Sequence, residues 1–228
     1  MKKLLLIAAT STALLTSAAS FAETGGFYLK AEGGATKLNM MKFKAEGAKS
    51  SGLKFKSAIS GIAGVGAGYY IMDNIRTEMT LDFLINPEFK YSETWKDGDA
   101  SEAIAKESVR ALLLSGYVDL YDAGIAKFFA GAGVGIAQVQ QKISGTNTMD
   151  GKKEKVDTMS FKSVNNFTYQ VSAGAAFNLA DGMNLDLTYS WKDYGETSDK
   201  VKGAKDNQKA GKDALRGHNL MAGIRFDI

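Results

Sequence analysis

Residues 167–195 read FTYQVSAGAAFNLADGMNLDLTYSWKDYG and carry the clearest structural pattern in the chain. Apolar side chains alternate with small or polar ones from Phe167 to Phe177, and the alternation returns from Leu185 to Trp191. This period of two is typical of β-strands, and the Asp-Gly pair between the two halves indicates a hairpin turn. The segment therefore predicts a β-hairpin with one continuous apolar side.

Two folds can hold such a hairpin. A soluble sandwich would bury the apolar side, whereas a membrane barrel would turn it to lipid and keep Asp186 in a polar interior. Phe177 lies near the turn, and four more rings lie toward the far ends of the strands: Phe167, Tyr169, Tyr189 and Trp191. Rings at both edges of an apolar band are typical of membrane barrels, so the aromatic positions favour the barrel.

The amino-terminal segment has the pattern of an export signal. Two lysines precede an apolar run, and small residues stand near Ala22 at the positions that a signal peptidase reads. We expect a signal peptide over residues 1–22 and a single domain over residues 23–228. The mature segment has no apolar run long enough for a membrane helix, which needs ~20 residues, so an exported soluble protein or a β-barrel remains.

The hairpin pattern repeats along the chain. The clearest ladder is 75–85, where Ile75, Met79 and Phe83 alternate with charged residues until Pro87 ends the strand. Short turns are expected near residues 73, 122 and 180, and long loops at 37–56, 88–107, 141–162 and 196–216. We therefore predict an all-β fold, a membrane-embedded eight-stranded antiparallel up-and-down β-barrel, with four long extracellular loops and both termini on the periplasmic side.

The inward positions of the predicted strands carry charges of both signs. They are Lys30, Glu32, Arg76, Glu78, Asp82, Asp119, Asp186, Arg225 and Asp227. Paired carboxylates can act as an acid and a base, but opposite charges in a narrow lumen can equally satisfy one another. We favour the second interpretation and expect no enzymatic activity and no sizeable pore, because side chains fill an eight-stranded interior.

Other chemistries find little support in the sequence. The chain has no cysteine and a single histidine, His218, so we expect no transition metal. The glycine runs at 61–68 and 131–135 lack the spacing of a phosphate-binding loop and lie within strands, so we expect no cofactor. A net charge of +3 is too small to indicate nucleic acid.

The long loops carry most of the lysines. Those of the third and fourth loops are the candidate partner-binding residues: Lys142, Lys152, Lys153, Lys155, Lys162, Lys200, Lys202, Lys205, Lys209 and Lys212. For each lysine alone, solvation or contact with anionic lipid head groups is a sufficient account. Together they form a basic rim that could attract an acidic segment of an extracellular protein. We expect the barrel to be a monomer in the lipid of the outer membrane.

Four short segments resemble one family of small barrels. They are FAGAGVG at 129–135, YQVSAG at 169–174, LDLTY at 185–189 with DYG at 193–195, and GIRF at 223–226. These are similar to the opacity-protein-like family of eight-stranded outer-membrane barrels, in particular the rickettsial surface adhesins. Family barrels usually end in phenylalanine, whereas this chain ends in Ile228.

The resemblance implies an adhesin that binds a host serum or matrix protein, and vitronectin is the family example. The residues alone indicate a barrel with basic loops. A small porin, or a structural barrel without a host ligand, is the alternative.

Overall fold

The computed structural model describes residues 25–40, 57–85, 87–94, 100–149, 152–198, 200 and 214–228. Within them the strands are β1 (Phe27–Met40), β2 (Ala58–Met72), β3 (Ile75–Ile85), β4 (Glu88–Thr94), β5 (Ala100–Asp122), β6 (Lys127–Met149), β7 (Lys152–Ser160), β8 (Val164–Ala180), β9 (Met183–Glu196) and β10 (Ala214–Asp227). No helix in this part of the chain is long and apolar enough to cross a membrane. The expected signal peptide at 1–22 lies outside the described residues.

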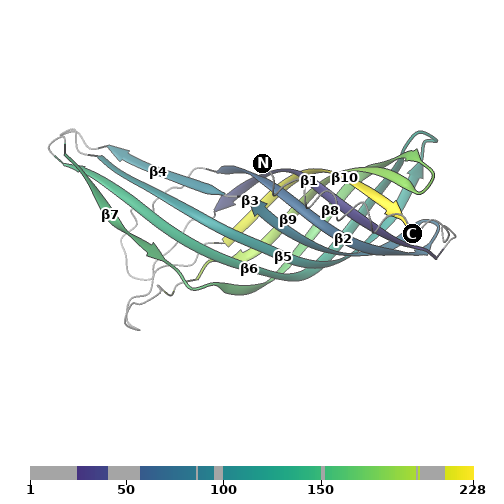
Figure 1. Cartoon of the computed structure of the whole chain (residues 1–228), viewed down its shortest axis with the longest axis horizontal. Helices are drawn as coiled ribbons and strands as arrows, with labels where there is room; N and C mark the ends of the chain where they lie inside the picture. Colours follow the sequence, from purple (N-terminus) through teal and green to yellow (C-terminus); the bar gives the residue numbers. More distant parts are fainter. Residues whose placement is uncertain are drawn as a thin grey trace, which may run out of the picture.

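Eight of these strands form a closed antiparallel barrel, which confirms the predicted fold (Figure 1). Around the barrel the order is β1, β2, β3, β5, β6, β8, β9 and β10, and β10 pairs with β1 to close it. The remaining two strands pair on one side only, β4 with β5 and β7 with β6. They extend the β5–β6 hairpin beyond the barrel.

The register of the barrel is staggered. Ala111 of β5 pairs directly with Ala137 of β6. Followed the other way, through β3, β2, β1, β10, β9 and β8, the same row of partners reaches β6 at Lys127, ten residues from Ala137. A stagger of this kind requires the strands to tilt against the barrel axis.

Short turns gather at one end of the barrel (Figure 1). They join β2 to β3, β5 to β6 and β8 to β9, and Gly124 and Gly182 have positive φ angles in the last two. The described chain also begins and ends at this edge, because the Ile228 amide donates to the Phe27 carbonyl at 2.8 Å. The long hairpins point the opposite way.

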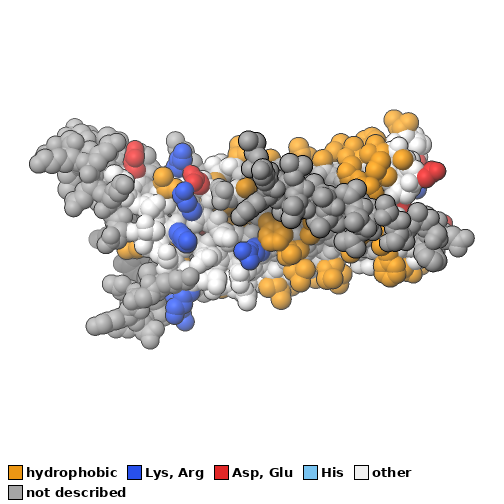
Figure 2. All heavy atoms as spheres, viewed as in Figure 1, with side chains coloured by type: hydrophobic (Ala, Val, Ile, Leu, Met, Phe, Trp, Pro, Cys, Tyr) orange, Lys and Arg blue, Asp and Glu red, His pale blue; other side chains and the backbone are white. Residues whose placement is uncertain are grey.

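The outer surface of the barrel carries a broad apolar belt (Figure 2). Large exposed side chains cover every barrel strand, among them Val65, Leu81 and Leu114. Rings mark both edges, with Phe27 at the edge that has the short turns and Phe167 at the other. The structure thus confirms that the apolar side of the 167–195 hairpin faces outward.

The interior at the level of this belt is charged. Its ion pairs among the described residues are Lys30–Glu32 at 2.8 Å, Lys30–Glu78 at 3.4 Å, Lys30–Asp186 at 4.0 Å, Arg76–Asp119 at 2.6 Å, Arg225–Asp186 at 3.4 Å and Lys192–Asp82. The last pair joins β9 to β3, which are not neighbours in the sheet. Asp227 instead accepts a hydrogen bond from the Tyr70 hydroxyl at 2.9 Å. The prediction that opposite inward charges pair with one another is confirmed, although neither carboxylate oxygen of Asp186 has a hydrogen-bond partner within the described part of the chain.

Toward the long-hairpin end the interior becomes apolar. One buried cluster contains Leu38, Ala58, Ile62, Leu84, Phe89, Ala105, Val109, Ala111, Leu113, Ala137, Val139, Tyr194, Leu215 and Met221. Leu113 points inward and so departs from the apolar-out pattern of its strand, but it lies in this cluster and is fully buried. The barrel interior is therefore charged near the short turns, and the apolar cluster begins within the belt at Leu113 and continues toward the long hairpins.

The expected loops at 88–107 and 141–162 are wrong, because both segments are largely strand. β4 and the start of β5 occupy the first, and the end of β6 with β7 occupies the second. Lys37 likewise lies in β1 and pairs with His218. The reason is physical: above the belt the outward positions face water and most inward positions are apolar, so the alternation continues with its polarity reversed. Most of the loops expected at 37–56 and 196–216 lies outside the described residues.

Candidate binding surface

A four-stranded sheet projects beyond the apolar belt (Figure 1). We call it the outer ribbon and define it as β4, β7, residues 100–110 of β5 and residues 138–149 of β6. Its inward face is mostly apolar, with Phe89, Val109 and Val139 buried there, and the buried Gln141 amide donates to the Glu107 carboxylate at 3.2 Å. Its outward face carries the exposed side chains of Lys90, Glu102, Lys106, Ser108, Arg110, Gln138 and Lys142. The ribbon thus has the polarity of a water-soluble sheet.

The outward face has more cations than carboxylates that could neutralise them. Glu88 and Lys106 form an ion pair at 2.7 Å, and the hydrogen bond and charge of Lys106 lower the pKa of the Glu88 carboxyl. Among the described residues, no carboxylate lies within ion-pair distance of Lys90, Arg110 or Lys142. These three cations are therefore available to a ligand.

The structure describes part of the predicted lysine set. Lys142, Lys162 and Lys200 are exposed. The backbones of Lys152, Lys153 and Lys155 lie on β7 and pair with the end of β6, while their side chains lie outside the description. Lys202, Lys205, Lys209 and Lys212 lie outside the described residues altogether.

One contact joins the two basic segments that were predicted to act together. The Lys162 amide donates to the Lys200 carbonyl at 2.9 Å, so the chain after β7 lies against the chain after β9. This places one lysine from each segment side by side at the base of the outer ribbon.

Three cations of the ribbon were missed because 88–107 was expected to be an acidic loop. Lys90 and Lys106 lie within that segment, and Arg110 follows it. The sequence does contain a pattern that indicates a strand here, because the polar residues Lys106, Ser108 and Arg110 occupy alternate positions, as the outward residues of a strand do. Of the apolar residues that could bind a partner instead, Met159 is exposed, whereas Phe161 is buried and unavailable.

The structure offers an alternative to the ribbon as a binding site. A cavity of about 420 Å³ lies at the end of the barrel with the short turns, and it is lined by Tyr70, Asp73, Asp119, Arg225 and Asp227, among others. Two of its carboxylates are already engaged, Asp119 by Arg76 and Asp227 by Tyr70. In the described part of the chain, no three metal-ligating side chains come together. The outer ribbon is therefore the better candidate for a binding surface.

A closed barrel with an apolar belt, a charged interior and a polar ribbon on one end defines an integral barrel of the outer membrane. The sequence matches the family described as "Outer membrane protein beta-barrel domain" over residues 5–226, and the chain belongs to this family. The belt therefore lies in the outer membrane, the short turns face the periplasm and the outer ribbon is extracellular.

Full-length relatives come from Rickettsia. A candidate adhesin of Rickettsia conorii is 40% identical over 250 residues and covers 100% of both chains. A candidate adhesin of Rickettsia felis is 39% identical over 235 residues, again with 100% of both chains covered. Among solved structures, the outer membrane protein OprG from Pseudomonas aeruginosa has a TM-score of 0.50 at 15% identity and covers 90% of this chain and 98% of its own. That likeness concerns the fold alone.

Proposed function

We propose that this protein is an adhesin whose basic extracellular surface binds an acidic region of a host serum or matrix protein, with vitronectin as the first ligand to test. It acts as a monomer, by binding and not by catalysis. The observation that carries the proposal is the outer ribbon, a sheet that stands clear of the membrane and holds Lys152, Lys153 and Lys155 on its strand β7. The rickettsial relatives named as candidate adhesins support it.

The lysines of β7 and of residues 200–212 are the proposed contact. β7 holds three lysines within four residues, and the Lys162–Lys200 hydrogen bond keeps the chain that follows β9 next to the chain that follows β7. Each exposed ion pair with a partner contributes only about 0.2 to 1 kcal/mol, so several must act together. Exposed pairs are screened by salt, because the Debye length falls from ~10 Å at 0.1 M to ~3 Å at 1 M.

The test is adhesion of bacteria that display the protein to immobilised vitronectin. We expect the combined substitution of Lys152, Lys153, Lys155, Lys202, Lys205 and Lys209 by alanine to remove most of the adhesion. Adhesion of the unsubstituted protein should also fall as salt rises to several hundred millimolar. The matched control changes the same six positions to arginine, which keeps the charge and should keep the adhesion.

Folding of each variant is checked by the faster gel migration of an unboiled sample. If the alanine variant folds and still adheres at high salt, the electrostatic proposal is wrong, and exposed apolar residues such as Met159 become the candidates. If bacteria displaying the unsubstituted protein gain no adhesion to serum or matrix proteins, the adhesin proposal itself fails.

A further inference from the structure

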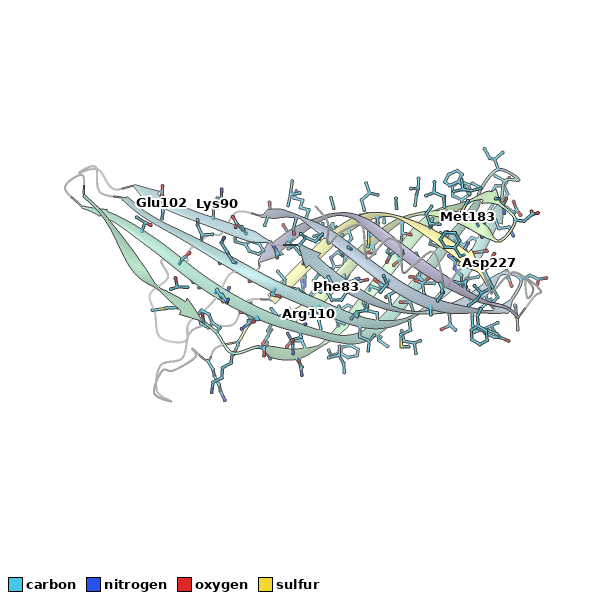
Figure 3. The ribbon with its side chains drawn as sticks, in the orientation of Figure 1. Phe83, Lys90, Glu102, Arg110, Met183 and Asp227 are labelled. Carbon is cyan, nitrogen blue, oxygen red and sulfur yellow. The ribbon has the colours of Figure 1, made fainter. Side chains whose placement is uncertain are left out.

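The apolar belt ends abruptly on the wall formed by β5, β6 and β8. Leu112, Ile136 and Phe167 are paired across these strands, and their exposures are 48%, 60% and 66%. The next outward row, two residues farther from the membrane centre, is Arg110, Gln138 and Asn165. Phe83 of β3 pairs with Arg110 on the other side, as Figure 3 shows. On these three strands the outward side chains therefore change from apolar to polar between two successive outward rows.

The rows above this boundary are basic or carry amide and hydroxyl groups. Ser108 pairs with Gln140, and Lys106 then pairs with Lys142. Figure 2 shows blue side chains gathered next to the orange belt on the side away from the short turns. Arg110 and Lys106 are four residues apart on one strand, which separates the two basic rows by about 13 Å.

Two features of this patch, the facing lysines and an arginine unpaired in the described part of the chain, favour the binding of an anion. Like charges directly opposite each other in a sheet are destabilising, and Lys106 faces Lys142. Glu88 compensates only one of these two charges. Arg110 also has no carboxylate partner among the described residues, whereas Arg216, across the barrel on β10, is paired with Asp193 at 2.8 Å. Arg110 and Lys142 thus leave unneutralised charge on this wall, at the height of lipid head groups.

We infer that this patch, made of Arg110, Gln138, Gln140 and Lys142, binds the phosphorylated head group of a glycolipid in the outer leaflet. Arg110 contacts a phosphate at the boundary of the acyl region, and Lys142 contacts a second phosphate or anionic group farther out. The amides of Gln138 and Gln140 donate to sugar hydroxyls or phosphate oxygens between them. Leu112, Ile136 and Phe167 contact the acyl chains of the same molecule.

This inference does not depend on the proposed adhesion. It assigns Lys142 to the membrane and leaves the lysines of β7 and of 200–212 to the host partner. Substitution of Lys142 should therefore change lipid binding and not adhesion.

The experiment titrates the folded protein in detergent with a bisphosphorylated glycolipid and, separately, with the same glycolipid after its phosphates are removed. The readout is the temperature at which the fast-migrating folded band is lost from the gel. The phosphorylated form should raise this temperature, and the dephosphorylated form should raise it much less. In R110Q/K142Q the glycolipid concentration for half-maximal stabilisation should rise about 30-fold, because each of the two cations near a membrane surface contributes about 1 kcal/mol.

K90Q is the matched control, since Lys90 is an exposed cation on the same ribbon, farther from the membrane (Figure 3). It should leave the titration unchanged. The inference is overturned if both glycolipids stabilise the protein equally, if R110Q/K142Q binds as well as the parent, or if K90Q weakens binding as much. Should the double variant fold poorly, R110Q and K142Q alone are each expected to weaken binding about fivefold, and the absence of any change in both would equally overturn the inference.

Discussion

Replacement of Lys192 by methionine should lower the free energy of unfolding by about 3 to 5 kcal/mol. Lys192 is 2% exposed and pairs with Asp82 across the lumen, from β9 to β3. Removing the cation leaves the Asp82 carboxylate buried without its partner, near Glu32 and the rest of the charged interior. The expected loss is measured by urea unfolding in lipid vesicles, followed by the folded band on a gel.

Two variants separate this effect from a general loss of charge. K127M removes a lysine that is half exposed and lies 4.0 Å from Asp122, so it should change stability little. K192M/D82L replaces both members of the buried pair by apolar side chains and should recover much of the loss, since a buried pair is often matched by hydrophobic residues of similar size. A K192M barrel as stable as the parent would show that water reaches and solvates Asp82.

Leu113→Asp should have an effect of similar or larger size, above about 4 kcal/mol, or prevent folding. Leu113 is fully buried in the apolar cluster, and its cross-strand partners are Thr80 and Gly135. An inward carboxylate would be tolerated in a water-filled channel. In a dry apolar core it has no partner and also leaves part of the leucine volume empty.

Leu113→Met is the control for packing. It keeps the volume and polarity of the side chain, so it should cost less than about 1.5 kcal/mol. The same urea titration compares the two variants. If Leu113→Asp unfolds at the urea concentration of Leu113→Met, the interior around Leu113 is wet, and the small-porin alternative regains support.

The membrane-spanning part of this fold could be predicted because its pattern is simple. Between the short turns and the belt edge, outward positions such as Leu81 are apolar and inward positions such as Asp82 are polar. Each strand there has apolar residues outward and polar residues inward. The short turns that join these strands contain glycine or aspartate. The eight strands, the inward charges and the direction of the turns all follow from that rule.

The outer ribbon could not be predicted from the same rule because the polarity of the alternation reverses at the membrane boundary. In β5 the even positions face outward throughout, yet Leu112 is apolar and Arg110 is charged. The run from Ala111 to Leu114 is where the two patterns meet, so both faces are apolar for a few residues. If every strand is expected to have apolar outward residues and polar inward residues, the strand is predicted to end near this run and a loop is predicted beyond it.

The candidate site was predicted in part for the same reason. Lys142 and Lys162 were predicted as candidates because they lie in a segment of the sequence that is rich in lysine. Arg110 and Lys90 were not, because their importance depends on which face they occupy and on how far they lie from the belt. Both facts require the register of the strands.

Labelling from outside the cell tests directly whether the apolar belt spans the outer membrane and the outer ribbon stands outside the cell. Because the chain has no cysteine, single-cysteine variants can be labelled in intact bacteria with a membrane-impermeant maleimide. We predict that Lys90→Cys is labelled in intact cells, Asp73→Cys only after the outer membrane is permeabilised, and Leu114→Cys only after unfolding. Labelling of Asp73→Cys in intact cells without labelling of Lys90→Cys, or ready labelling of Leu114→Cys in the folded protein, would contradict the account.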